Sequence, residues 1–182
     1  MHIRGVSEAM TGRATPRFGI AFQPIVDVGA RRVIAQEALV RGLGGGPAAS
    51  VLGRGGGGQR FGVEIAIARH ALGRAVALGI DTDVHVNFSP GVLLHAPDAL
   101  SAIAAVAEAE AFPLARLVLE VTEGARIDDP PRLGRVVEAA RALGIGVAID
   151  DFGAGYNGLS LLAGVQPAII KIDMTLPRGI DL

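Results

Sequence analysis

The stretch Leu117-Val-Leu-Glu-Val-Thr-Glu123 is a short apolar run with one carboxylate inside it and a second at its end. Buried strands that bring polar side chains to one shared end are how an α/β barrel builds a site. Most of the polar groups are hard oxygen donors, so the pattern predicts a magnesium-type site. Four other segments follow the same plan: Val33-Ile-Ala-Gln-Glu-Ala-Leu39, Val84-His-Val-Asn-Phe-Ser89, Val147-Ala-Ile-Asp-Asp151 and Ile169-Ile-Lys-Ile-Asp173.

The first two expected strands, over residues 18–26 and 33–40, are joined only by residues 27–32. A connection that short cannot cross over a sheet, so these strands should run antiparallel. The later strands alternate with helical patterns, which indicates a mostly parallel sheet. We expect helices over residues 61–78 with Gly79 as C-cap, from an Asp98 N-cap to about 111, from near Pro131 to Gly144, and over 159–164.

The polar residues at the shared strand ends, the strand-helix alternation and the short first link together predict a TIM-like (β/α) barrel with an antiparallel first strand. A closed eight-stranded barrel needs about 250 residues, whereas this chain has 182. We count six strands and expect the last two strand-helix units to be missing. Residues 1–17 are expected to be a flexible leader and 18–182 the barrel domain. The glycine-dense residues 42–58 are expected to be a flexible loop, since they lack the Gly-Lys-Ser/Thr ending of a phosphate-binding loop.

Composition excludes several classes of function. Seventeen basic and eighteen acidic residues give a net charge of −1, which argues against DNA binding through a broad basic surface. The absence of cysteine excludes disulfides, zinc-thiolate sites and thiol nucleophiles. No stretch reaches about 18 uninterrupted apolar residues, and the N-terminus lacks a secretory signal pattern. These features predict a cytoplasmic protein that makes no use of a membrane.

Lys171 is the only lysine among the seventeen basic residues, and it lies inside an apolar strand. Genomic bias toward arginine explains the general scarcity of lysine. The exception at Lys171 favours a need for a compact ammonium rather than a guanidinium.

The acidic residues at the strand ends are the strongest candidates for chemistry. Glu120 alternates with Leu119 and Val121 and so faces either the barrel interior or the helices. A buried carboxylate in either place needs a cation or hydrogen-bond donors. Asp150 and Asp151 are adjacent and can bind or bridge two divalent ions. Phosphoacceptor receiver domains also pair acids with a lysine, but there the acids follow the first strand, whereas here they follow the fifth.

Other polar residues in the strands carry less weight alone. Glu37 could be solvated or paired with a nearby arginine, and Asn87 could simply end a strand. The histidines show no metal-ligand spacing. Among them only His85 shares strand parity with Asn87, and we expect a structural role for it.

Taken in order, these strings resemble the EAL-domain phosphodiesterases of cyclic di-GMP. The family is named for the tripeptide found here as Glu37-Ala38-Leu39. Several of these sequence motifs are most similar to those of the branch found with BLUF blue-light sensors. The resemblance covers nearly all the chain after about residue 18 and rests on Phe22-Gln-Pro-Ile-Val-Asp27, Asn87-Phe-Ser89, Leu119-Glu-Val-Thr-Glu-Gly124, Ala148-Ile-Asp-Asp-Phe-Gly-Ala-Gly-Tyr156 and Lys171-Ile-Asp173.

The resemblance implies a bacterial signalling hydrolase that converts cyclic di-GMP to linear pGpG with two Mg²⁺ or Mn²⁺ ions. It implies that Lys171 orients or polarises the attacking water and that Glu123 anchors the loop after Asp150 and Asp151. Gln23 and Arg41 would contact the guanine and phosphate of the substrate. The implied ligands of the first ion are Glu37, Asn87, Glu120 and Asp150, with Asp150 and Asp151 reaching the second.

The chain departs from the family pattern at its end. Family members continue into a seventh strand with a Glu-Gly-Val-Glu string and an eighth with a substrate-contacting glutamine, and neither string occurs before Leu182. The alternative is therefore a catalytically inactive module. Such a module would bind cyclic di-GMP, or it would bind a partner chain or a second copy of itself at the open sheet edge. Composition alone would also allow an enolase-type barrel, which the ordered EAL strings disfavour.

Overall fold

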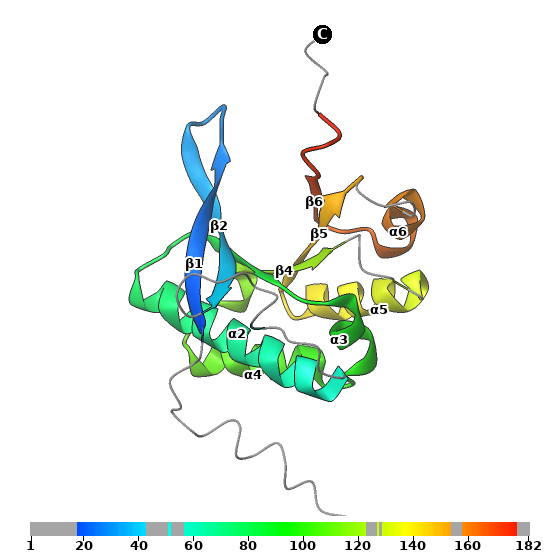
Figure 1. Ribbon diagram of the computed structural model, residues 1–182, viewed down its shortest axis with the longest axis horizontal. Coiled ribbons are helices and arrows are strands. Elements are labelled where there is room, and N and C mark those ends of the chain that lie inside the picture. The colour runs from blue at the N-terminus through cyan, green and yellow to red at the C-terminus, as the bar shows by residue number, and fades with distance from the viewer. Residues whose placement is uncertain are drawn as a thin grey trace, which may run out of the picture.

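The computed structural model describes residues 18–42, 51, 57–122, 127, 129–153 and 158–177. In this part of the chain six strands form one sheet, and their order in the sheet follows their order in the sequence (Figure 1). The first pair is antiparallel, as predicted, and every later pair is parallel. The strands are β1 (Phe18–Asp27), β2 (Arg32–Gly42), β3 (Asp83–Asn87), β4 (Leu117–Thr122), β5 (Gly146–Phe152) and β6 (Ile169–Ile172).

Helices fill the connections between the parallel strands, which confirms the predicted alternation. The helices are α2 (Gly57–Ala77), α3 (Pro90–His95), α4 (Ala99–Ala109), α5 (Pro130–Ala142) and α6 (Gly158–Val165), with the 3₁₀ turn η2 (Leu114–Arg116) before β4. In the described part of the chain, α2 lies before β3, α3 and α4 lie between β3 and β4, and α5 and α6 lie in the next two connections. No helix among these described residues has the length and hydropathy required to cross a membrane.

The sheet is strongly curled. β2 and β6 are four places apart in the strand order, so a flat sheet would separate them by about 19 Å. Instead, Lys171 on β6 lies 2.9 Å from Glu37 on β2. In Figure 1, β1 and β2 rise at one end of the sheet and β5 and β6 at the other, with β4 between them. The described strands therefore form an open, incomplete barrel, as the strand count predicted.

Alternation along the strands separates an apolar outer face from a polar inner face. In β4, Leu119 and Val121 belong to the hydrophobic core that the strands share with the helices, while Glu120 between them lies on the opposite face. The same parity puts Val86 in the core and its neighbours His85 and Asn87 on the inner face. Helices cover the outer face through residues such as Leu72, Ile103 and Leu133, which are completely buried.

The sequence analysis missed one helix and misjudged details of two others. α3 follows Ser89 at its N-cap and begins with Pro90, a combination typical of a helix start, yet no helix was predicted there. α2 begins at Gly57, before the predicted residue 61. Asp98 precedes α4 as predicted, but its side chain makes no capping hydrogen bond. The predicted leader over residues 1–17, and most of the predicted loop over 42–58, lie outside the described residues.

Three helices end in the same C-terminal motif, in which one residue adopts a left-handed backbone conformation. After α2 this residue is Gly79, with φ 66°, and after α5 it is Gly144, with φ 80°. After α4 it is Ala111, with φ 54°. In each case the next residue donates its N–H to the third-last residue of the helix, as Phe112 does to Ala107 at 2.8 Å. Ala111 is therefore a strained residue in a position that favours glycine.

We predict that Ala111→Gly stabilises the protein. The left-handed conformation costs an alanine about 1 kcal/mol, whereas glycine adopts it freely. The free energy of unfolding, measured by urea titration at neutral pH, should rise by about that amount.

Gly144→Ala is the matched reverse change. A Cβ at Gly144 would meet no other heavy atom within 4 Å, so its effect should come from the backbone conformation alone and lower the stability by about 1 kcal/mol. A loss of stability in Ala111→Gly would show that the glycine's greater freedom in the unfolded chain outweighs the relieved strain.

Candidate metal site

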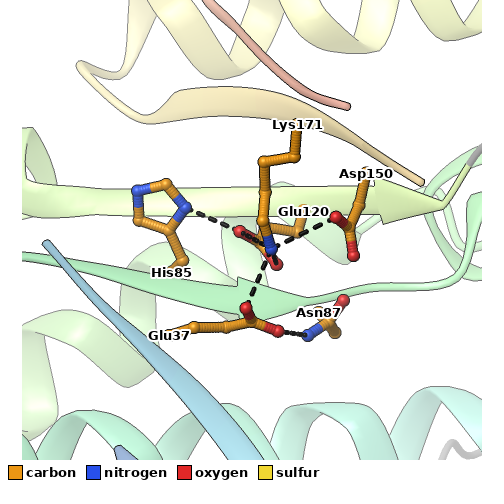
Figure 2. Close-up of polar contacts among 6 residues, drawn as sticks. All are labelled: Glu37, His85, Asn87, Glu120, Asp150 and Lys171. Carbon is orange, nitrogen blue, oxygen red and sulfur yellow. Dashed lines mark hydrogen bonds and ion pairs between the residues drawn. The ribbon is translucent and has the colours of Figure 1, made fainter. Parts of the chain in front are cut away.

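The ammonium of Lys171 lies among three carboxylates on the inner face of the sheet (Figure 2). Its Nζ is 2.9 Å from Glu37 Oε2, 2.8 Å from Glu120 Oε1 and 3.2 Å from Asp150 Oδ1. These residues come from β6, β2, β4 and β5. The inward-facing strand residues that were distant in the sequence are thus brought to one point by the curl of the sheet.

Glu120 is the most deeply buried member of this cluster, with no exposed surface. Besides Lys171 it has a second donor, His85, whose Nδ1 is 2.7 Å from Glu120 Oε1. Because the carboxylate accepts this hydrogen bond, the proton of the imidazole lies on Nδ1. His85 is itself 3% exposed, so the pair is fixed by packing. The sequence analysis expected only a structural role for His85 and did not connect it with Glu120.

Asn87 extends the cluster along β3. It is paired with Glu120 in the β3–β4 register, and its Nδ2 lies 3.3 Å from Glu37 Oε1. Its amide nitrogen is thus directed to Glu37, as Figure 2 shows, while the amide oxygen is a neutral ligand of the kind that divalent cations accept.

Asp150 and Asp151 lie in an irregular part of β5. The register with β6 shifts between Ile149 and Phe152, and Asp151 has φ 55°, which is unusual for a residue other than glycine. Such a bulge breaks the alternation of the strand and can re-aim adjacent side chains. Asp150 contacts Lys171, whereas Asp151 is exposed. Backbone strain of this kind is often stored at functional sites.

The cluster carries excess negative charge, and the pKa values respond to it. Partial burial raises the pKa of Asp151, and the neighbouring charges of Asp150 and Asp173 raise it further, against a lowering effect of Lys171. Burial alone lowers the pKa of Lys171, but its hydrogen bonds to Glu120 and Glu37 and the charge of Asp150 raise it well above its ordinary value. Lys171 is therefore held as a cation.

The donor set fits a divalent metal ion. One carboxylate oxygen from each of Glu37, Glu120 and Asp150 lies within 4.8 Å of the others. Oxygens bound to one Mg²⁺ at about 2.1 Å are at most about 4.2 Å apart, so binding needs only a small contraction. All are hard oxygen ligands, and three carboxylates exceed the one ammonium in charge.

The two predicted substrate-contacting residues lie beside the cluster. Gln23 on β1 is directly opposite Glu37 in the antiparallel register, so the two side chains share one face. Arg41 follows Glu37 by four residues on β2. It lines a cavity of about 260 Å³, and Asn87 lines the same cavity. Arg41 Nη1 donates to the Val40 carbonyl at 3.1 Å. Glu123, the predicted loop anchor, lies outside the described residues.

Sequence reasoning also missed Glu64 on α2. This side chain is buried, with 3% exposure, and lines the same cavity. Its position in an amphipathic helical pattern gave no sign that it faces the sheet.

Comparison with known proteins gives one family. The model of the EAL domain matches residues 6–181. Over 157 residues the chain is 36% identical to the blue light- and temperature-regulated antirepressor BluF of Escherichia coli (strain K12), a match that covers 86% of this chain and 39% of BluF. A shorter match, 40% identical over 67 residues, is to the cyclic di-GMP phosphodiesterase PA2567 of Pseudomonas aeruginosa and covers 37% of this chain and 11% of that protein.

A solved structure confirms the fold. The complex of Klebsiella pneumoniae BlrP1 with manganese and cyclic di-GMP at pH 9.0 superposes with a TM-score of 0.82 at 34% identity, covering 91% of this chain and 43% of that one. The chain therefore spans less than half the length of each of these proteins.

We predict that Lys171→Met destabilises the metal-free protein by about 3 kcal/mol, because it leaves three carboxylates, one of them completely buried, without their shared cation. Urea unfolding in EDTA at pH 7 measures the effect. Arg74→Met, which removes an exposed positive charge near the end of α2, should change the stability little.

The same pair of proteins gives a pH test. Folding raises the pKa of Lys171 above its ordinary 10.5, so its stabilisation is complete below that pH and is lost as the pH rises above it. The stability difference between the wild type and Lys171→Met should thus be equal at pH 7 and pH 9 and smaller at pH 11. A difference that is absent at pH 7 would show that Lys171 does not hold the carboxylates together.

Proposed function

The chain belongs to the EAL domain family, and on that premise we propose that it hydrolyses cyclic di-GMP to linear pGpG with the help of Mg²⁺ or Mn²⁺. The observation that carries the proposal is the convergence of Glu37, Glu120 and Asp150 around Lys171. Two findings on similar proteins support it. PA2567 is named a cyclic di-GMP phosphodiesterase, and BlrP1 was solved with manganese and cyclic di-GMP.

We assign the cation-binding role to the inner face of β2 to β5. Glu120, held by His85, and Asp150 would bind the first ion together with Glu37 and the amide oxygen of Asn87. Asp150 and Asp151 would reach a second ion, for which the bulge in β5 supplies adjacent carboxylates. Divalent ions at such a site activate water and neutralise the charge on the phosphoryl oxygens.

Lys171 would act as a fixed positive charge and hydrogen-bond donor. Beside these carboxylates the pKa of Lys171 is raised, which favours the charged ammonium over the neutral amine. An ammonium with three donors can orient the attacking water and stabilise the negative charge that develops as the P–O bond breaks. This role explains why the chain's one lysine occupies this position.

The substrate would approach from the side of β1 and β2. Gln23 shares a face with Glu37, and Arg41 lines the cavity that includes Asn87. A guanidinium is suited to a phosphate or to the acceptor edge of guanine, and the Gln23 amide offers both a donor and an acceptor to a base. Glu123 would anchor the loop that follows Asp151.

A second function is favoured by one relative. BluF, 36% identical over 157 residues, is named an antirepressor, which describes action on another protein. The alternative is therefore an EAL module that binds cyclic di-GMP or a partner chain without hydrolysis.

We predict that the purified chain releases pGpG from cyclic di-GMP in Mn²⁺ or Mg²⁺ and that EDTA stops the reaction. Asp150→Asn should reduce kcat by at least about 100-fold, since it weakens a ligand that both ions share. Glu138→Gln removes an exposed carboxylate on α5 that pairs with Arg141 and should leave the rate unchanged. Chromatographic separation of cyclic di-GMP from pGpG provides the measurement.

Calorimetry on the same samples separates the two functions. Binding of cyclic di-GMP without pGpG release would support the non-catalytic module and contradict the hydrolase. Hydrolysis that persists in EDTA would contradict the role of the carboxylate cluster.

A further inference from the structure

Glu64 is a buried carboxylate that the proposed mechanism does not use. It lies on α2 with 3% exposure, and a charged group with so little access to water requires compensating partners. Its two oxygens have different partners. Oε1 accepts from Arg60 Nε at 3.0 Å, one helical turn earlier, and Oε2 accepts from the backbone N–H of Ser89 at 3.0 Å.

The bond to Ser89 connects α2 with the end of β3. Ser89 comes two residues after Asn87 and is the N-cap of α3. Its own hydroxyl makes no capping bond, and among the described residues its buried Oγ has no partner. The Glu64 carboxylate is thus the group that accepts the hydrogen bond of the Ser89 backbone N–H.

Hydrogen bonds to β4, α2 and α3 hold the segment from Asn87 to Ser89 in place. The N–H of Phe88 donates to the Glu120 carbonyl at 2.9 Å, which continues the ladder with β4. The N–H of Ser89 donates to Glu64, and the Ser89 carbonyl accepts from Val92 at 3.0 Å to start α3. Asn87 itself is exposed, and among the described residues its side chain makes one hydrogen bond, the 3.3 Å contact to Glu37. The position of its amide therefore depends on how firmly the following residues are held.

We propose that Glu64 is a positioning residue, which fixes the β3–α3 connection through Ser89 and so holds Asn87 in place as a cation ligand. Arg60 fixes the carboxylate in turn, and both residues line the cavity that includes Asn87 and Arg41. This inference rests on the cation site of the proposed function. Residues that orient metal ligands from behind typically change metal affinity by about 10- to 100-fold when they are replaced.

Mn²⁺ affinity, measured by calorimetry on the chain without nucleotide, tests the proposal. Glu64→Met keeps a similar volume but cannot accept a hydrogen bond, and it should weaken Mn²⁺ binding about tenfold. Glu138→Met makes the same chemical change at an exposed site on α5 and should leave the affinity unchanged. If Glu64→Met is unfolded by circular dichroism, Ser89→Pro removes the same bond from the donor side. Ser89 has φ −72°, which proline adopts, and the same loss is expected.

A double-mutant cycle shows whether Glu64 acts through Asn87. In an Asn87→Ala background, Glu64→Met should cause no further loss of Mn²⁺ affinity. A tenfold loss that persists in that background, or a folded Glu64→Met that binds Mn²⁺ like the wild type, would overturn the inference and leave the proposed function standing. A wild-type chain that binds no Mn²⁺ would overturn both.

Discussion

The structure depends on the need to compensate one buried carboxylate. Glu120 has no exposed surface, and in the apolar interior of a strand pair such a group is tolerated only with close donors. They come from both sides: His85 on the neighbouring strand β3, and Lys171 two strands away on β6. Because Lys171 also contacts Glu37 on β2, one ammonium links β6 with a strand four places away in the sheet. The sheet must therefore be curled, and the curl is what gives the inner face its cluster of oxygens.

The same arrangement places function and stability in opposition. Three carboxylates share one ammonium. Asp151 lies beside them in the bulge of β5, where its backbone has a left-handed conformation and the pKa of its carboxyl group is raised. Without further positive charge these groups repel one another, and the repulsion costs stability. A divalent cation would relieve this repulsion, and the stability regained in that way would contribute to the free energy of cation binding. The wall of the neighbouring cavity contains Arg41 and the Arg60–Glu64 ion pair, so Arg41 is the positive charge that this cavity would offer to an anionic substrate.

Much of this could be predicted from the sequence, because periodicity encodes which face a strand residue takes. The alternation of Glu120 with Leu119 and Val121 indicated that its carboxylate faces either the barrel interior or the helices, and in the structure it faces the interior. The short link between the first strands predicted the antiparallel pair, which is found. The bulge at Asp150 and Asp151 was not foreseen, since it arises from pairing with β6 rather than from local sequence. His85 and Glu64 were missed for a related reason: their partners, Glu120 and the Ser89 amide, are 35 and 25 residues away, and no local pattern reveals them.

We propose that the carboxylates around Lys171 form a divalent cation site, and anomalous X-ray scattering from crystals grown with MnCl₂ can locate the ion. We expect a manganese peak at about 2.2 Å from carboxylate oxygens of Glu37, Glu120 and Asp150, with the Lys171 ammonium moved aside but still within reach of the cluster. Manganese bound elsewhere, with Lys171 still paired to all three carboxylates, would contradict it.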